Sequence, residues 1–122
     1  MASSKKSKPK TQAKRIGVAL SGGLDSVVLL DAVCKAYPHD AVYALHVHHG
    51  LQTQADEWLL FCERLAKRYR IDFDFRLVHL PITANLETHA RQARYEALLG
   101  LCDQHQLDHL LFAHHQHDQA ET

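Results

Sequence analysis

The sequence predicts an α/β fold of Rossmann type: an open parallel sheet with helices on both faces, incomplete at its C-terminal end. Two features of the 122 residues support this class. Short apolar stretches alternate with longer segments of helical periodicity, and the first apolar stretch runs directly into a loop with two adjacent glycines. Such alternation is typical of parallel strands joined by right-handed crossovers. Hydrophobic residues make up 46% of the chain, enough for the core of one small domain.

Four apolar stretches are the expected strands, at residues 16–20, 41–47, 72–79 and 110–113. Helical spacing of apolar residues predicts the helices between them, at about 24–37, 53–70 and 86–105. The first helix should end before Pro38, because proline cannot continue it. In the third strand Phe73, Phe75 and Leu77 alternate with charged residues, which favours an edge strand with one wetter face.

The first residues differ from the rest in charge. Basic residues without any acidic one crowd the first fifteen positions: Lys5, Lys6, Lys8, Lys10, Lys14 and Arg15. We expect residues 1–14 to form a disordered, solvated tail, and an auxiliary contact of this tail with RNA phosphates stays open. Residues 15–122 would then be the N-terminal part of a larger domain, because a last predicted helix at 118–122 has barely begun.

Composition argues against several classes of protein. No stretch has the ~20 consecutive apolar residues of a membrane span, and the basic tail lacks the apolar centre of a signal peptide. The three cysteines lie far apart without a CxxC pair, which argues against a disulfide framework or a zinc knuckle. Each cysteine lies in a predicted helix among apolar residues. We therefore expect reduced thiols, no membrane partner and a cytoplasmic location.

The most informative stretch is residues 16–26, IGVALSGGLDS, in which a strand meets a loop and then a helix. Gly22 and Gly23 can adopt backbone angles closed to other residues and, without a Cβ, allow a ligand to approach their amides. The helix that follows directs unpaired N–H groups and a partial positive charge at the loop. Together these features predict a phosphate site. A tight turn capped by its own serine or aspartate side chains is the alternative.

The loop differs from two common phosphate-binding motifs. It lacks the lysine of GxxxxGK[ST], and it does not match GxGxxG. Asp25 is the acidic exception in a predicted anion site, and a bound Mg²⁺ ion is the natural reason for a carboxylate there. Alternatively, the Asp25 carboxylate simply favours the positive end of the helix.

Four stretches of the chain resemble the tRNA(Ile)-lysidine synthases. SGGLDS is similar to the PP-loop, SGGxDS, of the ATP pyrophosphatases, and HVHHGL, LETHARQARY and HHQHDQAET follow in the order of the family. The resemblance covers about residues 15–122 and implies an adenine-nucleotide α-hydrolase-like fold that uses ATP. It also implies the attachment of L-lysine to C2 of the wobble cytidine of a tRNA(Ile) with a CAU anticodon. That reaction passes through an adenylated tRNA and releases AMP and pyrophosphate.

The resemblance further implies roles for individual residues. The loop would hold pyrophosphate through Ser21, Gly22, Gly23, Leu24, Asp25 and Ser26. Asp25 and Asp118 would hold Mg²⁺ at the ATP site, and Glu121 would bind the amino group of lysine. Arg94, rather than Arg91, would contact a phosphate or the adenylate, because a guanidinium presents a fork that matches phosphate oxygens.

Histidines at the ends of the second and fourth strands are further candidates. Ligands of open parallel sheets bind beyond the carboxyl ends of the strands, so His48, His114 and His115 are expected near the nucleotide. Structural roles are the alternatives to these binding roles. A histidine at a strand end can be a structural residue of the core, and Arg94 can belong to a solvated helix face. His117 departs from the family pattern, which has aspartate or another short polar residue there, and this removes one potential Mg²⁺ carboxylate.

Two other functions fit the same residues. The chain can be another PP-loop ATP pyrophosphatase, either a tRNA thiolase or an amide-forming synthetase, although thiolases typically carry cysteine pairs that are absent here. It can also be a non-catalytic nucleotide- or metal-binding module. Eleven histidines are present, and the stretches HVHH and HHQH each place several of these potential zinc ligands close together. The formal net charge of zero gives no electrostatic argument for nucleic acid by itself.

Overall fold

The computed structural model describes residues 14–21, 23–48, 54–79 and 86–113. In these residues strands and α-helices alternate in the order β1 (Ile16–Ala19), α2 (Leu24–Ala36), β2 (Val42–His48), α3 (Ala55–Tyr69), β3 (Asp72–Leu77), α4 (Leu86–His105) and β4 (His109–Leu111). A short 3₁₀ turn, His39–Ala41, leads from α2 into β2. The strands form one sheet in the order β3-β2-β1-β4, and each neighbouring pair is parallel.

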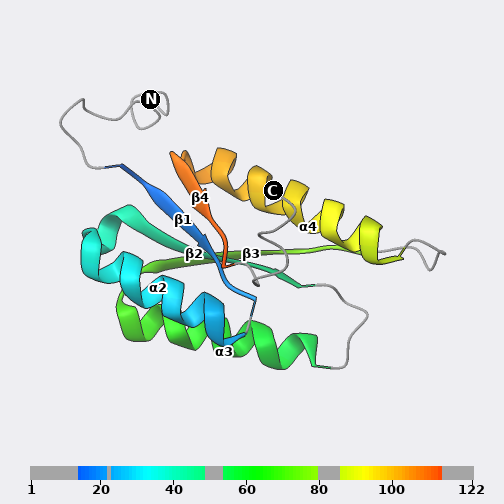
Figure 1. Ribbon diagram of the computed structural model, residues 1–122, viewed down its shortest axis with the longest axis horizontal. Helices are drawn as coiled ribbons and strands as arrows, with labels where there is room; N and C mark the ends of the chain where they lie inside the picture. Colours follow the sequence, from blue (N-terminus) through cyan, green and yellow to red (C-terminus); the bar gives the residue numbers. More distant parts are fainter. Residues whose placement is uncertain (1–13, 22, 49–53, 80–85, 114–122) are drawn as a thin grey trace.

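Helices cover both faces of the sheet (Figure 1), with α2 and α3 on one face and α4 on the other. The predicted α/β class is therefore confirmed. Because all strands are parallel, their carboxyl ends meet at one edge, where open sheets of this class bind ligands. Among the helices described, none combines the length and apolarity that a membrane crossing requires.

The predicted elements agree with the structure to within a few residues. The second strand begins one residue later than predicted, since Ala41 belongs to the turn that precedes β2. Helix α2 ends at Ala36, and the N–H of Tyr37 makes its last bond before Pro38 stops it, as predicted. Residues 1–13 of the predicted tail (1–14) and the helix predicted at 118–122 lie outside the described residues.

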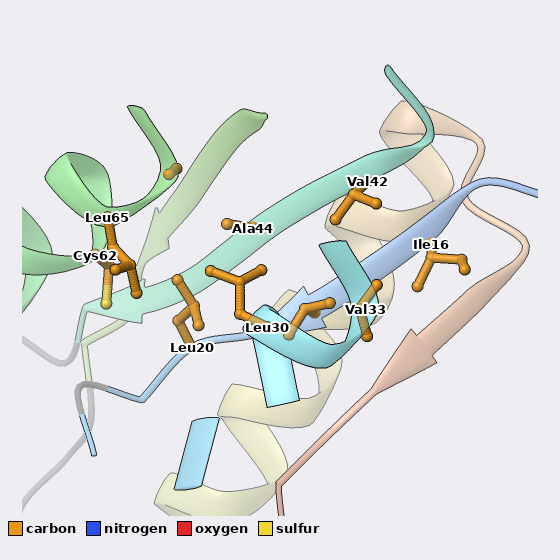
Figure 2. Close-up of a cluster of buried hydrophobic side chains, with 10 residues drawn as sticks. Ile16, Leu20, Leu30, Val33, Val42, Ala44, Cys62 and Leu65 are labelled. Atoms are coloured by element: carbon orange, nitrogen blue, oxygen red, sulfur yellow. The ribbon is translucent and has the colours of Figure 1, made fainter. Parts of the chain in front are cut away.

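The larger core lies between the sheet and helices α2 and α3 (Figure 2). Alternate residues of β1 and β2 point to this face, as the period of two of a strand requires. Its buried members are Ile16, Val18, Leu20, Leu30, Val33, Val42, Ala44, Cys62, Leu65 and Ala66. At its rim the Tyr69 hydroxyl donates to Asp31 at 2.8 Å and links α3 to α2. The pKa of Asp31 is lowered from its usual value, mainly by its hydrogen bond with Lys35 and next by the one from the Tyr69 hydroxyl.

The opposite core is built between the sheet and α4, from Ala19, Leu45, Val47, Ala97, Leu98 and Leu101. Gly17 of β1 faces this layer. A Cβ at Gly17 would lie 2.8 Å from Cδ1 of Leu107 and 2.9 Å from Cδ1 of Leu45. The absence of a side chain on this residue of β1 therefore lets the two leucines approach the strand.

β3 is an edge strand, as predicted, but its apolar side is only partly covered. Phe73 packs against the α2/α3 core, whereas Phe75 is 38% and Leu77 is 60% exposed. On the charged side, Oδ2 of Asp74 lies 2.6 Å from Nε2 of His105 at the end of α4. The other oxygen of Asp74 accepts the N–H of Phe75 at 2.8 Å. This bond occupies a backbone N–H that the edge strand does not use in the sheet.

The three cysteines are free thiols, in agreement with the prediction. Cys62 is fully buried in α3, and Cys34 and Cys102 are half-buried. Burial raises the pKa of both half-buried thiols. These side chains therefore act as core residues rather than as nucleophiles.

Arg15 joins the start of β1 to the end of α4, on the side of the sheet where the strands begin. Its backbone N–H donates to Oδ2 of Asp108 at 2.8 Å, and its guanidinium donates to the His105 carbonyl at 2.8 Å. The same guanidinium lies 5.4 Å from the centroid of the Tyr43 ring. A cation at the C-terminal end of a helix is electrostatically favourable. Arg15 therefore belongs to the folded domain, although its charge continues that of the basic tail.

We expect Arg15→Ala to lower the free energy of unfolding by about 2 kcal/mol, because it removes charged hydrogen bonds and an aromatic contact. Chemical denaturation of the chain measures this directly. Arg64→Ala, which truncates an exposed arginine of α3, is the matched control and should change stability by less than about 0.5 kcal/mol. Equal losses in the two variants would show that the contacts of Arg15 contribute nothing net.

Candidate functional site

The predicted phosphate loop lies between β1 and α2, at the carboxyl edge of the sheet. The N–H of Leu20 donates to the Leu45 carbonyl at 2.7 Å, after which the chain leaves the sheet. The buried hydroxyl of Ser26 accepts the N–H of Ser21 at 3.3 Å and donates to the Gly23 carbonyl at 2.9 Å. The N–H of Gly23 donates in turn to the Ser21 hydroxyl at 3.3 Å. The two serines thus fold the loop onto the first turn of the helix.

The outer side of this loop is open rather than packed against its own helix. Ser21, Gly23, Leu24 and Asp25 are all exposed. Gly23 is the N-cap of α2 and has no side chain with which to accept the N–H groups of the first turn. This helix end therefore presents backbone donors, and the positive end of the helix dipole, to whatever binds over the loop.

Gly23 does not use the conformational freedom of glycine. Its backbone is extended, with φ −90° and ψ 164°, which other residues also adopt. A Cβ there would lie 3.5 Å from the Ser21 hydroxyl, an ordinary contact. A side chain at this position is therefore compatible with the backbone, and what distinguishes Gly23 is that its backbone is exposed beside the loop. Gly22 lies outside the described residues.

Two histidines of β2, His46 and His48, lie on the α3 face of the sheet and are 4% and 8% exposed. Nε2 of His48 lies 2.6 Å from Oδ1 of Asp56, in the first turn of α3. This contact assigns the proton to Nε2 and leaves Nδ1 as an acceptor in the neutral ring. Within the described part of the chain Nδ1 of His48 is buried without a hydrogen-bond partner. A buried polar atom in that state is unfavourable until a donor reaches it.

Arg94 lies on the other face of the sheet, on α4. Its guanidinium stands 5.7 Å from the centroid of Phe112, directly after β4, and the ring of Tyr95 stacks on the same phenylalanine at 5.9 Å. Burial lowers the pKa of Arg94. The ion pairs within the described residues do not include it. A partly buried cation of this kind favours an anionic ligand.

The loop, His48 and Arg94 thus all belong to elements that end or begin at one edge of the sheet. The loop follows β1, His48 ends β2, and Phe112 beneath Arg94 follows β4. Five predicted site residues lie outside the described residues: Gly22, His114, His115, Asp118 and Glu121. Among the described residues, no group of three His, Cys, Asp or Glu side chains is placed to hold a metal ion.

Three contacts that shape this edge were not predicted from the sequence. Asp56 holds His48, Phe112 supports Arg94, and His46 donates through Nδ1 to the Leu20 carbonyl at 2.7 Å. An acidic residue in the first turn of a helix and an aromatic residue after a strand are too common to identify a site. Only the pairing of distant elements distinguishes them.

The fold and site together define a class: an α/β protein with an open, glycine-capped loop, the predicted phosphate loop, at the carboxyl edge of a parallel sheet. A family model described as a PP-loop domain matches residues 2–122. The chain therefore belongs to the PP-loop family, as its SGGLDS motif suggested.

Individual relatives carry a more specific name. The chain is 45% identical over 111 residues to a tRNA(Ile)-lysidine synthase of Bordetella pertussis, covering 88% of this chain and 35% of that protein. It is 41% identical over 107 residues to a protein of the same name from Hydrogenovibrio crunogenus, covering 86% of this chain and 25% of that one. It thus spans about a third or a quarter of the length of these curated relatives.

A solved structure shares the fold. The U34-tRNA thiolase NcsA of Methanococcus maripaludis, solved with its [4Fe-4S] cluster, superposes with a TM-score of 0.70. The match covers 84% of this chain and 38% of the thiolase at 22% sequence identity. At this identity the likeness supports the α/β architecture alone.

Proposed function

We propose that this chain supplies the ATP-binding part of an enzyme that attaches L-lysine to the wobble cytidine of a tRNA(Ile) with a CAU anticodon. The observation that carries the proposal is the open loop at the glycine-capped start of α2, in a chain similar to proteins named tRNA(Ile)-lysidine synthase. We place the reaction in the cytoplasm, where its tRNA substrate is used.

The proposed reaction has two steps. In the first, O2 of the cytidine attacks the α-phosphorus of ATP, a new P–O bond forms, and pyrophosphate leaves with the electrons of the broken α–β bond. In the second, an amino group of lysine attacks C2, the C2–N bond forms, and AMP leaves with O2 while the amine loses a proton. The net products are lysidine, AMP and pyrophosphate.

The described residues suit the first step. Negative charge develops on the leaving pyrophosphate, next to the backbone donors and positive dipole of α2. The first turn of α2, which begins at Leu24, would contribute its N–H groups there, while Ser26 holds the loop through its own hydroxyl. Arg94 would bind the α-phosphate or the adenylate, which would pair its desolvated guanidinium with an anion.

Magnesium fits the same edge through its donor chemistry. The exposed carboxylate of Asp25 stands in the first turn of α2, beside the open loop, and Mg²⁺ is commonly held by one or two carboxylates together with substrate phosphates. Asp25 and Asp118 would be those carboxylates. The ion would supply charge neutralisation on the phosphates.

Histidines would contact the nucleotide. Nδ1 of His48, buried and without a partner in the described residues, would accept a hydrogen bond from a hydroxyl or amino group of ATP. His114 and His115, which follow the fourth strand in the sequence, are proposed for the same nucleotide. Glu121, three residues after Asp118 in the sequence, is proposed for the lysine ammonium group.

The role of Glu121 makes a separate prediction. Glu121→Ala should raise the KM for lysine by about tenfold or more and leave the KM for ATP nearly unchanged, because one charge partner of lysine alone is lost. Steady-state kinetics against both substrates measure the two constants. A larger change in the KM for ATP would move Glu121 to the nucleotide site.

Because the chain spans about a third of the Bordetella relative, activity is best measured in a hybrid. Here the chain replaces the matching segment of that relative. With ATP, Mg²⁺, lysine and a tRNA(Ile) transcript, we expect the cytidine of the CAU anticodon to gain the mass of lysine. A hybrid that binds the tRNA and ATP but leaves this cytidine unmodified would contradict the proposal.

A further inference from the structure

We propose that His46 is a positioning residue, which fixes the phosphate loop by holding the carbonyl of Leu20. The inference rests on the proposed function, because it assigns the loop to ATP. His46 is 4% exposed, and its Nδ1 lies 2.7 Å from the Leu20 carbonyl oxygen. A carbonyl only accepts hydrogen bonds, so Nδ1 carries the proton and donates.

Leu20 is the residue from which the loop departs. Its N–H belongs to the sheet, donating to Leu45, whereas its carbonyl bonds to the side chain of His46. That carbonyl and the N–H of Ser21 are the two ends of one planar peptide group. Since the Ser21 N–H donates to the Ser26 hydroxyl, side chains hold this peptide from both ends. Its orientation sets the direction in which the loop leaves the sheet.

The imidazole is itself held in place by the core. Sγ of Cys62, on α3, lies 3.6 Å from Nδ1 of His46, and Cys62 is fully buried. Leu20 and Cys62 both belong to the buried cluster drawn in Figure 2. His46 therefore joins three elements, β2, α3 and the exit from β1. A ring confined in this way gives the loop one orientation rather than several.

Loop orientation matters because backbone donors act only at the correct distance from a phosphate. Displacements of about 1 Å in such groups reduce catalysis by up to about 100-fold. Loss of the His46 bond should therefore weaken ATP binding by about tenfold, without any contact between His46 and the nucleotide.

Three substitutions test this placement. In His46→Asn the amide Nδ2 takes the position of the imidazole Nδ1, so the bond to Leu20 is retained. His46→Gln moves its donor further along the side chain, and His46→Leu removes it. Val42→Ala is the control: it lies on the same face of β2, is equally buried, and sits at the opposite end of the strand from the loop.

The measurement is titration calorimetry of the folded chain with ATP and Mg²⁺, with thermal unfolding recorded for each variant. We expect His46→Asn to bind within about threefold of the unsubstituted chain and His46→Gln and His46→Leu to bind about tenfold more weakly. Val42→Ala should lower the unfolding temperature and leave the Kd unchanged.

The outcomes distinguish a failure of the proposed function from a failure of the inference alone. If the unsubstituted folded chain fails to bind ATP with Mg²⁺, the proposed function fails and the inference falls with it. If it binds and His46→Gln binds equally well, only the inference is overturned. Equal weakening by Val42→Ala would also overturn it, since stability alone would then account for the effect. Where His46→Leu does not fold, the Asn and Gln variants carry the comparison.

Discussion

Asp25→Asn should reduce lysine transfer in the hybrid enzyme by a factor on the order of 10³. The substitution keeps the size and polarity of the side chain and removes the negative charge that would hold Mg²⁺ on the ATP phosphates. Asp25 is exposed on the first turn of α2, so the fold should survive, with a small loss from the helix dipole. Single-turnover assays at saturating ATP measure the rate of the chemical step.

Magnesium dependence provides the control for this variant. If Asp25 holds the ion, the variant should need a higher Mg²⁺ concentration for half-maximal ATP binding than the unsubstituted chain does. Asp40→Asn, which changes an exposed carboxylate in the 3₁₀ turn at the opposite edge, should leave both quantities unchanged. Full activity of Asp25→Asn would remove Asp25 from the proposed metal site.

Arg94→Lys should lower kcat/KM by about 100-fold although it preserves the charge. A lysine cannot reproduce the planar fork that contacts two phosphate oxygens, and it stacks less well on the ring of Phe112. Steady-state kinetics with ATP varied at saturating tRNA and lysine give the ratio. We expect the loss mainly in kcat, because the contact would strengthen as charge develops on the α-phosphate.

The neighbouring arginine supplies the comparison for Arg94. Arg91 is exposed on the same helix, one turn earlier, so Arg91→Lys should retain nearly full activity. Arg94→Met removes a desolvated charge and should leave the free energy of unfolding of the chain unchanged or raised while activity is lost. A strong loss of stability in Arg94→Met, with activity lost only in proportion to the folded fraction, would make Arg94 a structural residue.

Much of the fold could be predicted from the sequence because local patterns determine it. Apolar stretches with intervening helical periodicity give the order of elements, and the charged alternation in Asp72–Leu77 correctly indicates an edge strand. The exposure of Phe75 and Leu77 could not be predicted in the same way. Their alternation is that of a buried face, and only the position of α3 decides that Phe73 alone reaches the core.

The same difference between local and long-range patterns applies to the candidate site. The loop from Ser21 to Ser26 is contiguous, so its glycines and hydroxyls predict a phosphate loop without a structure. The contacts of His46 with Leu20 and of His48 with Asp56 depend on how β2 and α3 pack, which no local pattern encodes. The support of Arg94 by Phe112 joins α4 to the end of β4 in the same manner.

The position at which ATP is cleaved tests the central claim most directly. The hybrid enzyme is supplied with γ-labelled ATP, Mg²⁺, lysine and tRNA(Ile), and the labelled product is separated by chromatography. An α–β cleavage on the loop between β1 and α2 predicts labelled pyrophosphate and an equal amount of AMP. Labelled inorganic phosphate together with ADP, in a reaction free of contaminating pyrophosphatase, would contradict the account.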